Sequence, residues 1–155
     1  MQICPTFPPN IGGVGNYAKI LCDHLKKRKI KSKILISDHL DNKNNKKNLF
    51  GKKNKNLLLL LENNISQNVV LHFSGYGYAS RGLCFNLIKS LEIWKQNKSN
   101  RKLITIFHEI YATGPFYRMS FWTSFLQKYL AKKLFKLTDI CLATSKQNQF
   151  ILSSF

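Results

Sequence analysis

Acidic residues are scarce in this sequence. It holds seven Asp and Glu against 25 Lys and Arg, so its formal net charge is +18 at pH 7. A domain this basic is expected to attract an anionic partner such as nucleic acid, anionic lipid or a phosphorylated sugar. The basic residues form two clusters, at 26–33 and at 43–55, although a run of lysines is usually a solvated face.

Three other features are missing. The cysteines Cys4, Cys22, Cys84 and Cys141 lack metal-ligand spacing, which favours reduced, buried thiols over a metal site or a disulfide scaffold. The longest apolar run, Leu57–Leu61, is far short of the roughly 20 residues that span a bilayer. The start lacks the charged-then-apolar pattern of a signal peptide. We therefore expect a cytoplasmic protein, soluble or peripheral on the inner face of the plasma membrane.

The chain of 155 residues is long enough for one domain with a real core, and too short for two. Asn and Lys alternate over residues 41–56 with almost no apolar residues between them. Such a segment cannot bury enough apolar surface to order itself, so we expect a flexible surface insertion there. Compositional bias of the genome is the alternative source of the pattern.

Apolar runs typical of buried strands alternate with helical stripes along the chain. Strands are expected at 34–36, 69–73, 103–107 and 139–143, and helices at 13–29, 57–63, 81–96 and 120–137. Ser145 is the expected N-cap of a last helix that the end of the chain cuts short. The expected packing side of the helix at 120–137 holds Trp122, Phe125, Leu126, Tyr129, Leu130 and Leu134.

This alternation predicts an α/β fold, a Rossmann-like parallel sheet of five or six strands with helices on both faces. In such sheets ligands bind outside the carboxyl ends of the strands. The loops to examine are therefore those that follow the strands, and they hold most of the unusual polar and aromatic residues of the chain.

A glycine-rich turn, Ile11–Tyr17, lies between the short apolar start and the first helix. Glycines bring backbone N–H groups close to a bound group, and a helix N-terminus favours negative charge. The turn is therefore a candidate site for an anionic or polyhydroxylated ligand. The alternative is a tight strand-to-helix turn that binds nothing.

Two later loops carry the other candidates. Tyr76 and Tyr78 offer rings and hydroxyls suited to a sugar, or else they cover the core. His108 and Glu109 follow a buried strand and are the best catalytic pair, although neighbouring strand residues point to opposite sides. His72 ends another strand, but two histidines without a third ligand make a poor metal site, so we expect no metal and no bound cofactor.

Four segments in this order resemble the N-terminal, acceptor-side domain of a GT-B-type glycosyltransferase: Ile11–Tyr17, Val69–Tyr78, Thr105–Glu109 and Asp139–Ser145. The resemblance covers nearly the whole chain, 1–155. It implies transfer of a sugar from a nucleotide-diphosphate-sugar donor to a hydroxyl acceptor, a glycan or a lipid-linked group, in cell-envelope polysaccharide or glycolipid synthesis. It also implies the site residues: catalytic His108 and Glu109, donor phosphate-binding Gly12, Gly13, Gly15 and Asn16, and acceptor-binding His72, Tyr76, Tyr78 and Tyr111.

The sequence departs from that family in one respect. The donor-binding half should carry two glutamates eight positions apart, and the glutamates here are Glu62, Glu92 and Glu109. We therefore expect a domain trimmed at both edges, with a separate C-terminal donor-binding subunit, or an inactive remnant. The basic clusters also fit an anionic membrane surface. The rival interpretations are a nucleic-acid-binding domain, which lacks a recognised motif, and a dinucleotide-binding domain, which lacks the G-x-G-x-x-G interval.

Overall fold

The structure is a computed structural model that describes residues 1–9, 12–37, 55–64, 67–112 and 119–155. Five parallel strands form one sheet in the order β2-β1-β3-β4-β5. They are β1 (Gln2–Cys4), β2 (Ile34–Ile36), β3 (Asn68–Ser74), β4 (Lys102–Glu109) and β5 (Ile140–Ala143). The predicted α/β fold with a parallel, Rossmann-like sheet is confirmed.

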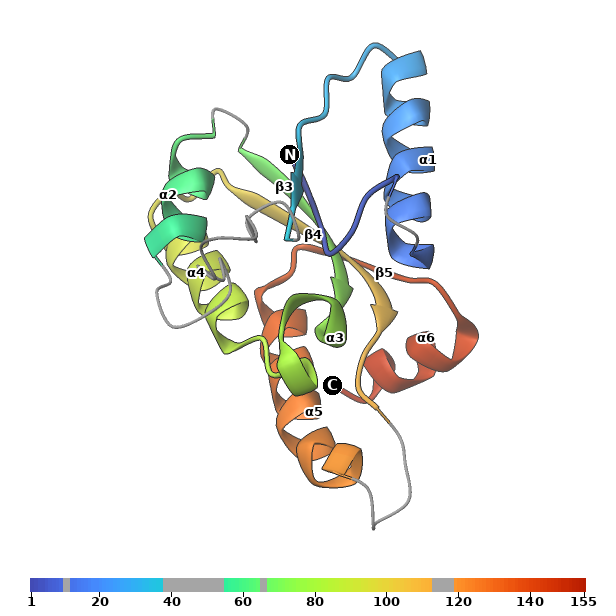
Figure 1. Cartoon of the computed structure of the whole chain (residues 1–155). Helices are drawn as coiled ribbons and strands as arrows, with labels where there is room; N and C mark the ends of the chain where they lie inside the picture. Colours follow the sequence, from blue (N-terminus) through green and yellow to red (C-terminus); the bar gives the residue numbers. More distant parts are fainter. Residues whose placement is uncertain (10–11, 38–54, 65–66, 113–118) are drawn as a thin grey trace, which may run out of the picture.

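Helices cover both faces of the sheet (Figure 1). They are α1 (Gly13–Lys27), α2 (Lys55–Glu62), the single turn α3 (Gly75–Tyr78), α4 (Phe85–Gln96), α5 (Met119–Leu137) and α6 (Lys146–Ser153). Crossovers between parallel strands are right-handed. Helix α1 connects β1 to β2 at one edge of the sheet, whereas α4 and α5 connect β3 to β4 and β4 to β5 toward the other edge. Helix α1 therefore lies on the opposite face from α4 and α5. Figure 1 shows α2 and α4 on one side of the sheet and α1 and α6 on the other.

The main core lies between the sheet and helices α2, α4 and α5. Strand side chains alternate between the two faces, and on this face the rings of Phe73 and Phe107 meet edge to face with centroids 5.4 Å apart. The fully buried side chains of this core include Leu57, Leu61, Leu71, Phe73, Leu87, Leu91, Trp94, Leu103 and Phe107. The opposite face, toward α1, carries the polar side chains described below.

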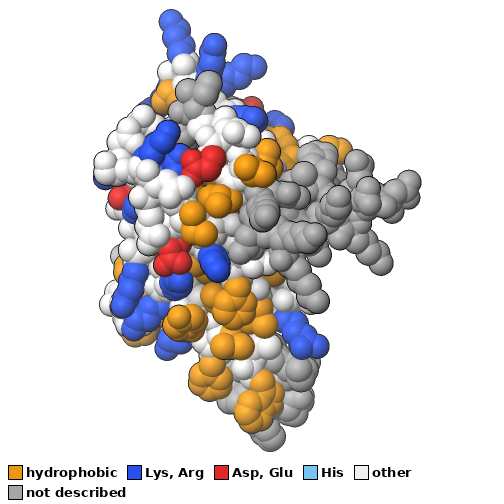
Figure 2. All heavy atoms as spheres, turned by 90° about the vertical axis from the view of Figure 1, so that its left-hand side faces the viewer, with side chains coloured by type: hydrophobic (Ala, Val, Ile, Leu, Met, Phe, Trp, Pro, Cys, Tyr) orange, Lys and Arg blue, Asp and Glu red, His pale blue; other side chains and the backbone are white. Residues whose placement is uncertain are grey.

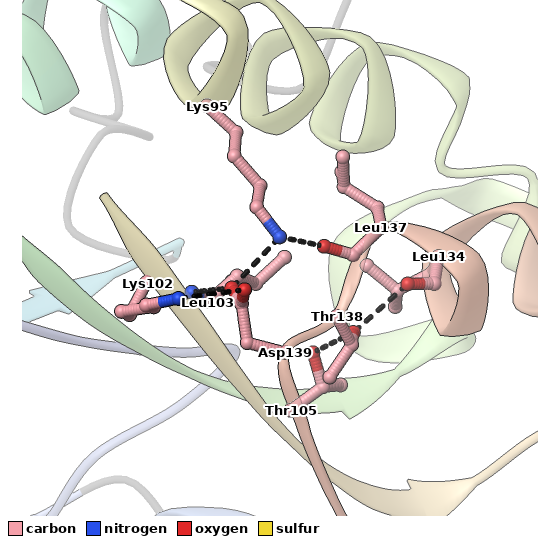
Figure 3. A network of polar contacts seen from close by, with 8 residues as sticks. All are labelled: Lys95, Lys102, Leu103, Thr105, Leu134, Leu137, Thr138 and Asp139. Carbon is pink, nitrogen blue, oxygen red and sulfur yellow. Dashed lines mark hydrogen bonds and ion pairs between the residues drawn. The ribbon is translucent and has the colours of Figure 1, made fainter. Parts of the chain in front are cut away.

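Asp139 anchors the amino end of the sheet (Figure 3). Its carboxylate accepts hydrogen bonds from the Leu103 backbone N–H at 2.8 Å and from Lys102 at 3.5 Å, and it pairs with Lys95 at 2.7 Å. Lys95 also donates to the Leu137 carbonyl at 2.6 Å. One carboxylate thus joins α4, the end of α5, β4 and β5, and these cationic and N–H donors hold the pKa of Asp139 below its usual value.

A second ion pair joins α2 to the start of β4. Arg101 is 4% exposed, donates to both Glu62 oxygens at 2.9 and 2.6 Å, contacts the Trp94 carbonyl and lies over the Trp94 ring. The hydrogen bond from Arg101 lowers the pKa of Glu62 to about 2. Removal of either partner would therefore leave the other charge uncompensated.

The expected element at 81–96 begins four residues later than the sequence suggested. Arg81 and Gly82 have positive φ angles of 58° and 71°, which interrupt the helical path, so α4 starts at Phe85. Of the expected surface insertion at 41–56, residues 41–54 lie outside the described residues, and Lys55 and Asn56 belong to α2. No helix in the described ranges combines the length and the apolar character needed to cross a bilayer.

The expected packing side of α5 is wrong. Trp122, Phe125, Leu126 and Tyr129 are exposed, and the helix buries Thr123, Gln127 and Ala131 together with the expected Leu130 and Leu134. Only two of the six expected contact residues, Leu130 and Leu134, face the core. The reason is local: near its start α5 packs against the small turn at 80–82, where Gln127 is held by hydrogen bonds with the Arg81 carbonyl and the Ala112 N–H.

Candidate functional site

The candidate site lies at the carboxyl ends of β1, β3 and β4, the edge of the sheet where the sequence placed it. The chain leaves β1 toward α1 on one face, and it leaves β3 toward α3 and α4 on the other (Figure 1). This divergence between adjacent strands is the topological switch point at which open α/β sheets form their ligand crevice.

A chain of hydrogen bonds connects two histidines beneath this edge. His72 in β3 lies opposite Ile106, which places His108 one pleat further along β4 on the same face. His72 Nδ1 is 3.3 Å from His108 Nε2, and His72 Nε2 is 2.9 Å from Gln2 Oε1. Gln2 in turn donates from Nε2 to Ser32 Oγ at 3.0 Å. With its amide in this orientation, Gln2 accepts from His72, so His72 accepts from His108.

Both imidazoles are held in the neutral form. Burial, aided by the neighbouring His108, lowers the pKa of His72 to about 4. Burial also lowers the pKa of His108, against the opposite effect of the adjacent Glu109 carboxylate. Since Nε2 of neutral His108 carries the proton donated to His72, its Nδ1 is an unprotonated nitrogen that can accept a proton.

Tyr17 brings the glycine-rich turn to the histidines. Its ring lies edge-on to His108, with centroids 5.1 Å apart, and to His72 at 5.9 Å. Gly15, two residues earlier, is buried, and a Cβ there would lie 2.7 Å from the Thr6 carbonyl oxygen, whereas a Cβ at Gly13 would have no atom of the described residues within 4 Å. Gly15 is therefore needed for close packing against the chain that leaves β1, and Gly13 is exposed at the helix start.

Gly12, Gly13, Gly15 and Asn16 thus lie where the sequence placed them, at the start of α1. Gly12 is the N-cap in an extended conformation, and its carbonyl accepts the Asn16 N–H at 3.0 Å. The N–H groups of the first helical turn have no partner within the helix, and α1 has no acidic side chain in that turn. This end of α1 can therefore receive an anionic group.

The end of β4 is fixed by residues from β5 and α6. Asn148 donates from Nδ2 to the His108 carbonyl at 3.0 Å and to the Phe107 carbonyl at 3.3 Å, and Thr144 donates from its hydroxyl to the same Phe107 carbonyl at 3.1 Å. Ser145 caps α6 by accepting the Asn148 N–H, as the sequence predicted. A cavity of about 280 Å³ opens here between His108 and α6.

A second cavity, of about 290 Å³, lies on the other side of the end of β4; we call it the tyrosine cavity. It is lined by Gly75, Tyr76, Glu109, Tyr111, Ala112 and Gln127. Glu109 accepts a hydrogen bond from the Ser74 hydroxyl at 2.8 Å, which fixes one carboxylate oxygen. The two cavities both contact Glu109 and Tyr111, so the end of β4 forms the ridge between them.

Gln127 of α5 holds the walls of the tyrosine cavity together. This side chain is 3% exposed; it donates to the Arg81 carbonyl at 2.7 Å and to the Tyr76 hydroxyl at 3.1 Å, and it accepts the Ala112 N–H at 2.8 Å. One amide therefore connects the loop after β3 with the loop after β4. It also fixes the ring of Tyr76, which is 48% exposed.

Of the six residues expected to act in catalysis or acceptor binding, four lie around the cavities and two do not. Tyr76, Tyr111, His108 and Glu109 line one or both cavities. Tyr78 does not: it is 5% exposed, and its hydroxyl donates to the His72 carbonyl at 2.9 Å and lies 3.2 Å from the Ile3 carbonyl. His72 is fully buried behind His108. Both expected acceptor residues therefore act inside the protein, where they support the strands and orient His108.

Three residues of the site were not identified from the sequence. Tyr17 is the last residue of the glycine-rich turn, two positions after Gly15, but it was given no role of its own in the site. Gln127 is a polar residue on the buried side of α5, a signal hidden by the wrong choice of packing side. Asn148 follows the Ser145 cap by one turn and had no distinguishing pattern.

Among the residues that the structure describes, no group of three or more His, Cys, Asp and Glu side chains is arranged to hold a metal ion. Comparisons of the chain with protein-family models, with curated proteins and with solved structures found no significant match. The functional interpretation therefore depends on the geometry of the site.

Proposed function

We propose that this chain is the acceptor-side domain of a glycosyltransferase, which binds a hydroxyl acceptor and helps to transfer a sugar to it from a nucleotide-diphosphate-sugar. The main support is the tyrosine cavity, in which two aromatic rings, a carboxylate and a buried amide surround about 290 Å³ at the carboxyl ends of β3 and β4. Aromatic faces beside fixed polar groups suit a sugar ring, and the volume is at the small end of ligand pockets, the size of one monosaccharide.

In the proposed reaction the acceptor hydroxyl lies in the tyrosine cavity and attacks the anomeric carbon of the donor sugar. The bond from that carbon to the diphosphate breaks, and the hydroxyl proton leaves to Glu109, which the Ser74 hydroxyl orients. Neutral His108 faces the transferring sugar as a hydrogen-bonding group without a competing charge. The N–H groups at the start of α1 stabilise the departing diphosphate. A C-terminal donor-binding domain or subunit supplies the remaining contacts to the nucleotide.

Acceptor binding is tested by saturation-transfer difference NMR on the isolated chain with a panel of methyl glycosides. Binding is expected to weaken about tenfold in Tyr76→Ala, which removes an aromatic wall of the tyrosine cavity, and in Glu109→Gln, which keeps the shape of the side chain but removes its charge. Tyr129→Ala is the matched control, since this exposed tyrosine lies outside the cavity. Absence of binding by any glycoside, or equal loss in Tyr129→Ala, contradicts the proposal and favours an inactive remnant.

The net charge of +18 favours a second candidate, a nucleic-acid-binding domain. Lys26, Lys29 and Lys31 surround a surface hollow of about 430 Å³ at the end of α1. The test is titration with random duplex DNA at several salt concentrations. A steep salt dependence, lost in a Lys26→Gln/Lys29→Gln variant, supports nucleic-acid binding, whereas weak binding that this variant retains excludes it.

A further inference from the structure

One side of α5 presents large apolar side chains to solvent; we call it the aromatic face. Trp122, Phe125, Leu126 and Tyr129 recur at intervals of three and four residues, so they share one side of the helix. Their exposed fractions are 66%, 65%, 46% and 60%. Figure 2 shows hydrophobic side chains gathered at the lower end of the molecule, the level at which α5 lies in Figure 1.

Lysines accompany the aromatic face. The sequence of α5 holds four lysines and no acidic residue. Lys132 and Lys136 are exposed and continue the aromatic face by two turns, because they follow Tyr129 by three and seven positions. Lys128, also exposed, lies beside the face. The whole chain carries the same sign of charge, +18.

We propose that the aromatic face docks the protein on an anionic lipid surface. Helix α5 then lies in the plane of the interface, with its four apolar side chains at the boundary between headgroups and acyl chains and its lysines beside lipid phosphates. A bilayer complements both parts of this surface, the apolar stripe and the positive charge. Nucleic acid fits less well, because Leu126 cannot stack on a base and Lys132 and Lys136 lie beyond the rings rather than between them.

Docking through α5 also sets the distance between the tyrosine cavity and the lipid surface. Gln127 lies on the buried side of the same helix and lines that cavity. A docked α5 therefore holds the cavity about one helix diameter, roughly 10 Å, from the lipid surface. The docking inference goes beyond the proposed sugar transfer and stands without it, since it depends only on exposure and charge.

The fluorescence of Trp122 tests the inference. The chain has two tryptophans, and Trp94 is 1% exposed in the core, so a change of emission on adding vesicles reports Trp122. Vesicles of phosphatidylcholine with phosphatidylglycerol, free of any glycan, are expected to shift the emission to shorter wavelength. Brominated acyl chains are expected to quench it. Vesicles of phosphatidylcholine alone are expected to have a weaker effect.

Variants separate the apolar from the electrostatic contribution, with co-sedimentation as the measurement. Leu126→Ser/Tyr129→Ser is expected to lower partitioning onto the anionic vesicles by about tenfold or more. Lys132→Gln/Lys136→Gln is expected to lower it about tenfold on anionic vesicles and little on neutral ones. Phe150→Ser is the matched control, because this side chain of α6 is 79% exposed and lies outside the aromatic face. Circular dichroism checks that each variant is folded.

Three outcomes overturn the inference. The first is no partitioning onto anionic vesicles. The second is partitioning without any change in Trp122 emission, which would mean that another surface binds. The third is a concentration-dependent dimer that Leu126→Ser/Tyr129→Ser dissociates, which would assign the aromatic face to a second copy of the chain. Failure to bind glycosides leaves all of these measurements unaffected, so the two proposals fail independently.

Discussion

Acidification is expected to destabilise this protein already at pH values at which its carboxylates are still ionised. His72 is fully buried, and its pKa is lowered from 6.5 to about 4. Between these two values the unfolded chain binds a proton at His72 and the folded chain does not, so stability is complete above pH 6.5 and falls as the pH falls toward 4. From pH 7 to pH 5 this difference amounts to about 2 kcal/mol of unfolding free energy.

The assay is urea unfolding followed by circular dichroism at pH 7 and at pH 5. His108 adds to the loss in the same direction, because burial lowers its pKa as well. His72→Gln keeps a donor and an acceptor at this position but cannot take up a proton, so it is expected to lose less stability than the wild type over this interval. His24→Gln, at an exposed histidine of α1, is the control and is expected to behave as the wild type does. Equal stability at the two pH values, or a full wild-type loss in His72→Gln, refutes the reasoning.

Three substitutions test the ion pair, the close packing and the buried hydrogen bonds described above, with thermal and urea unfolding as the measurements. Glu62→Gln is expected to cost about 2 kcal/mol, because it leaves the guanidinium of Arg101, 4% exposed, without its counter-charge; an unchanged midpoint contradicts this. Gly15→Ala is expected to lower the free energy of unfolding by about 2 kcal/mol, because the added Cβ would lie 2.7 Å from a backbone oxygen. Gly13→Ala is the control and is expected to be neutral, because its Cβ would contact no atom of the described residues. Equal effects of the two substitutions contradict the packing argument. Gln127→Leu is expected to cost about 2 kcal/mol and to weaken glycoside binding, because a buried N–H and a carbonyl lose their partner.

Four of the five strands could be predicted to within two residues at each end, because their apolar runs are short, β-branched and bounded by polar turns, whereas β1 (Gln2–Cys4) was not among the predicted strands. Ile34–Ile36 coincides with β2, and the run at 103–107 lies inside β4. The inner strands β3 and β4 are buried on both faces and so need apolar side chains throughout, whereas the edge strands β2 and β5 are half-buried or exposed and were found from the same apolar runs. The carboxyl-edge location of the site followed from the same reasoning, because it depends on topology alone.

The side of α5 could not be predicted in the same way. A stripe of Trp, Phe, Leu and Tyr satisfies the periodicity of a packed helix, and periodicity alone cannot tell a core from an exposed face. The burial of Tyr78 likewise depends on a contact between distant parts of the sequence. Its hydroxyl contacts the Ile3 carbonyl of β1 because α3 folds back over the sheet. The two residues are 75 positions apart in the sequence, so local sequence could not show this contact. His72 likewise reaches Gln2 across 70 residues.

The Asp139 anchor and the tyrosine cavity hold the two ends of the sheet by different kinds of hydrogen bond. Leu103 and Asp139 exchange a reciprocal pair of bonds, since the Leu103 N–H donates to the carboxylate and the Asp139 N–H donates to the Leu103 carbonyl, both at 2.8 Å. These two amide hydrogens can exchange with solvent only after this pair of bonds opens, so they are expected to be protected from exchange. At the carboxyl end the loops around the tyrosine cavity are joined through a side chain instead: Gln127 accepts the Ala112 N–H and donates to the Arg81 carbonyl, so the loss of this one amide would release both loops while the amino end stays closed.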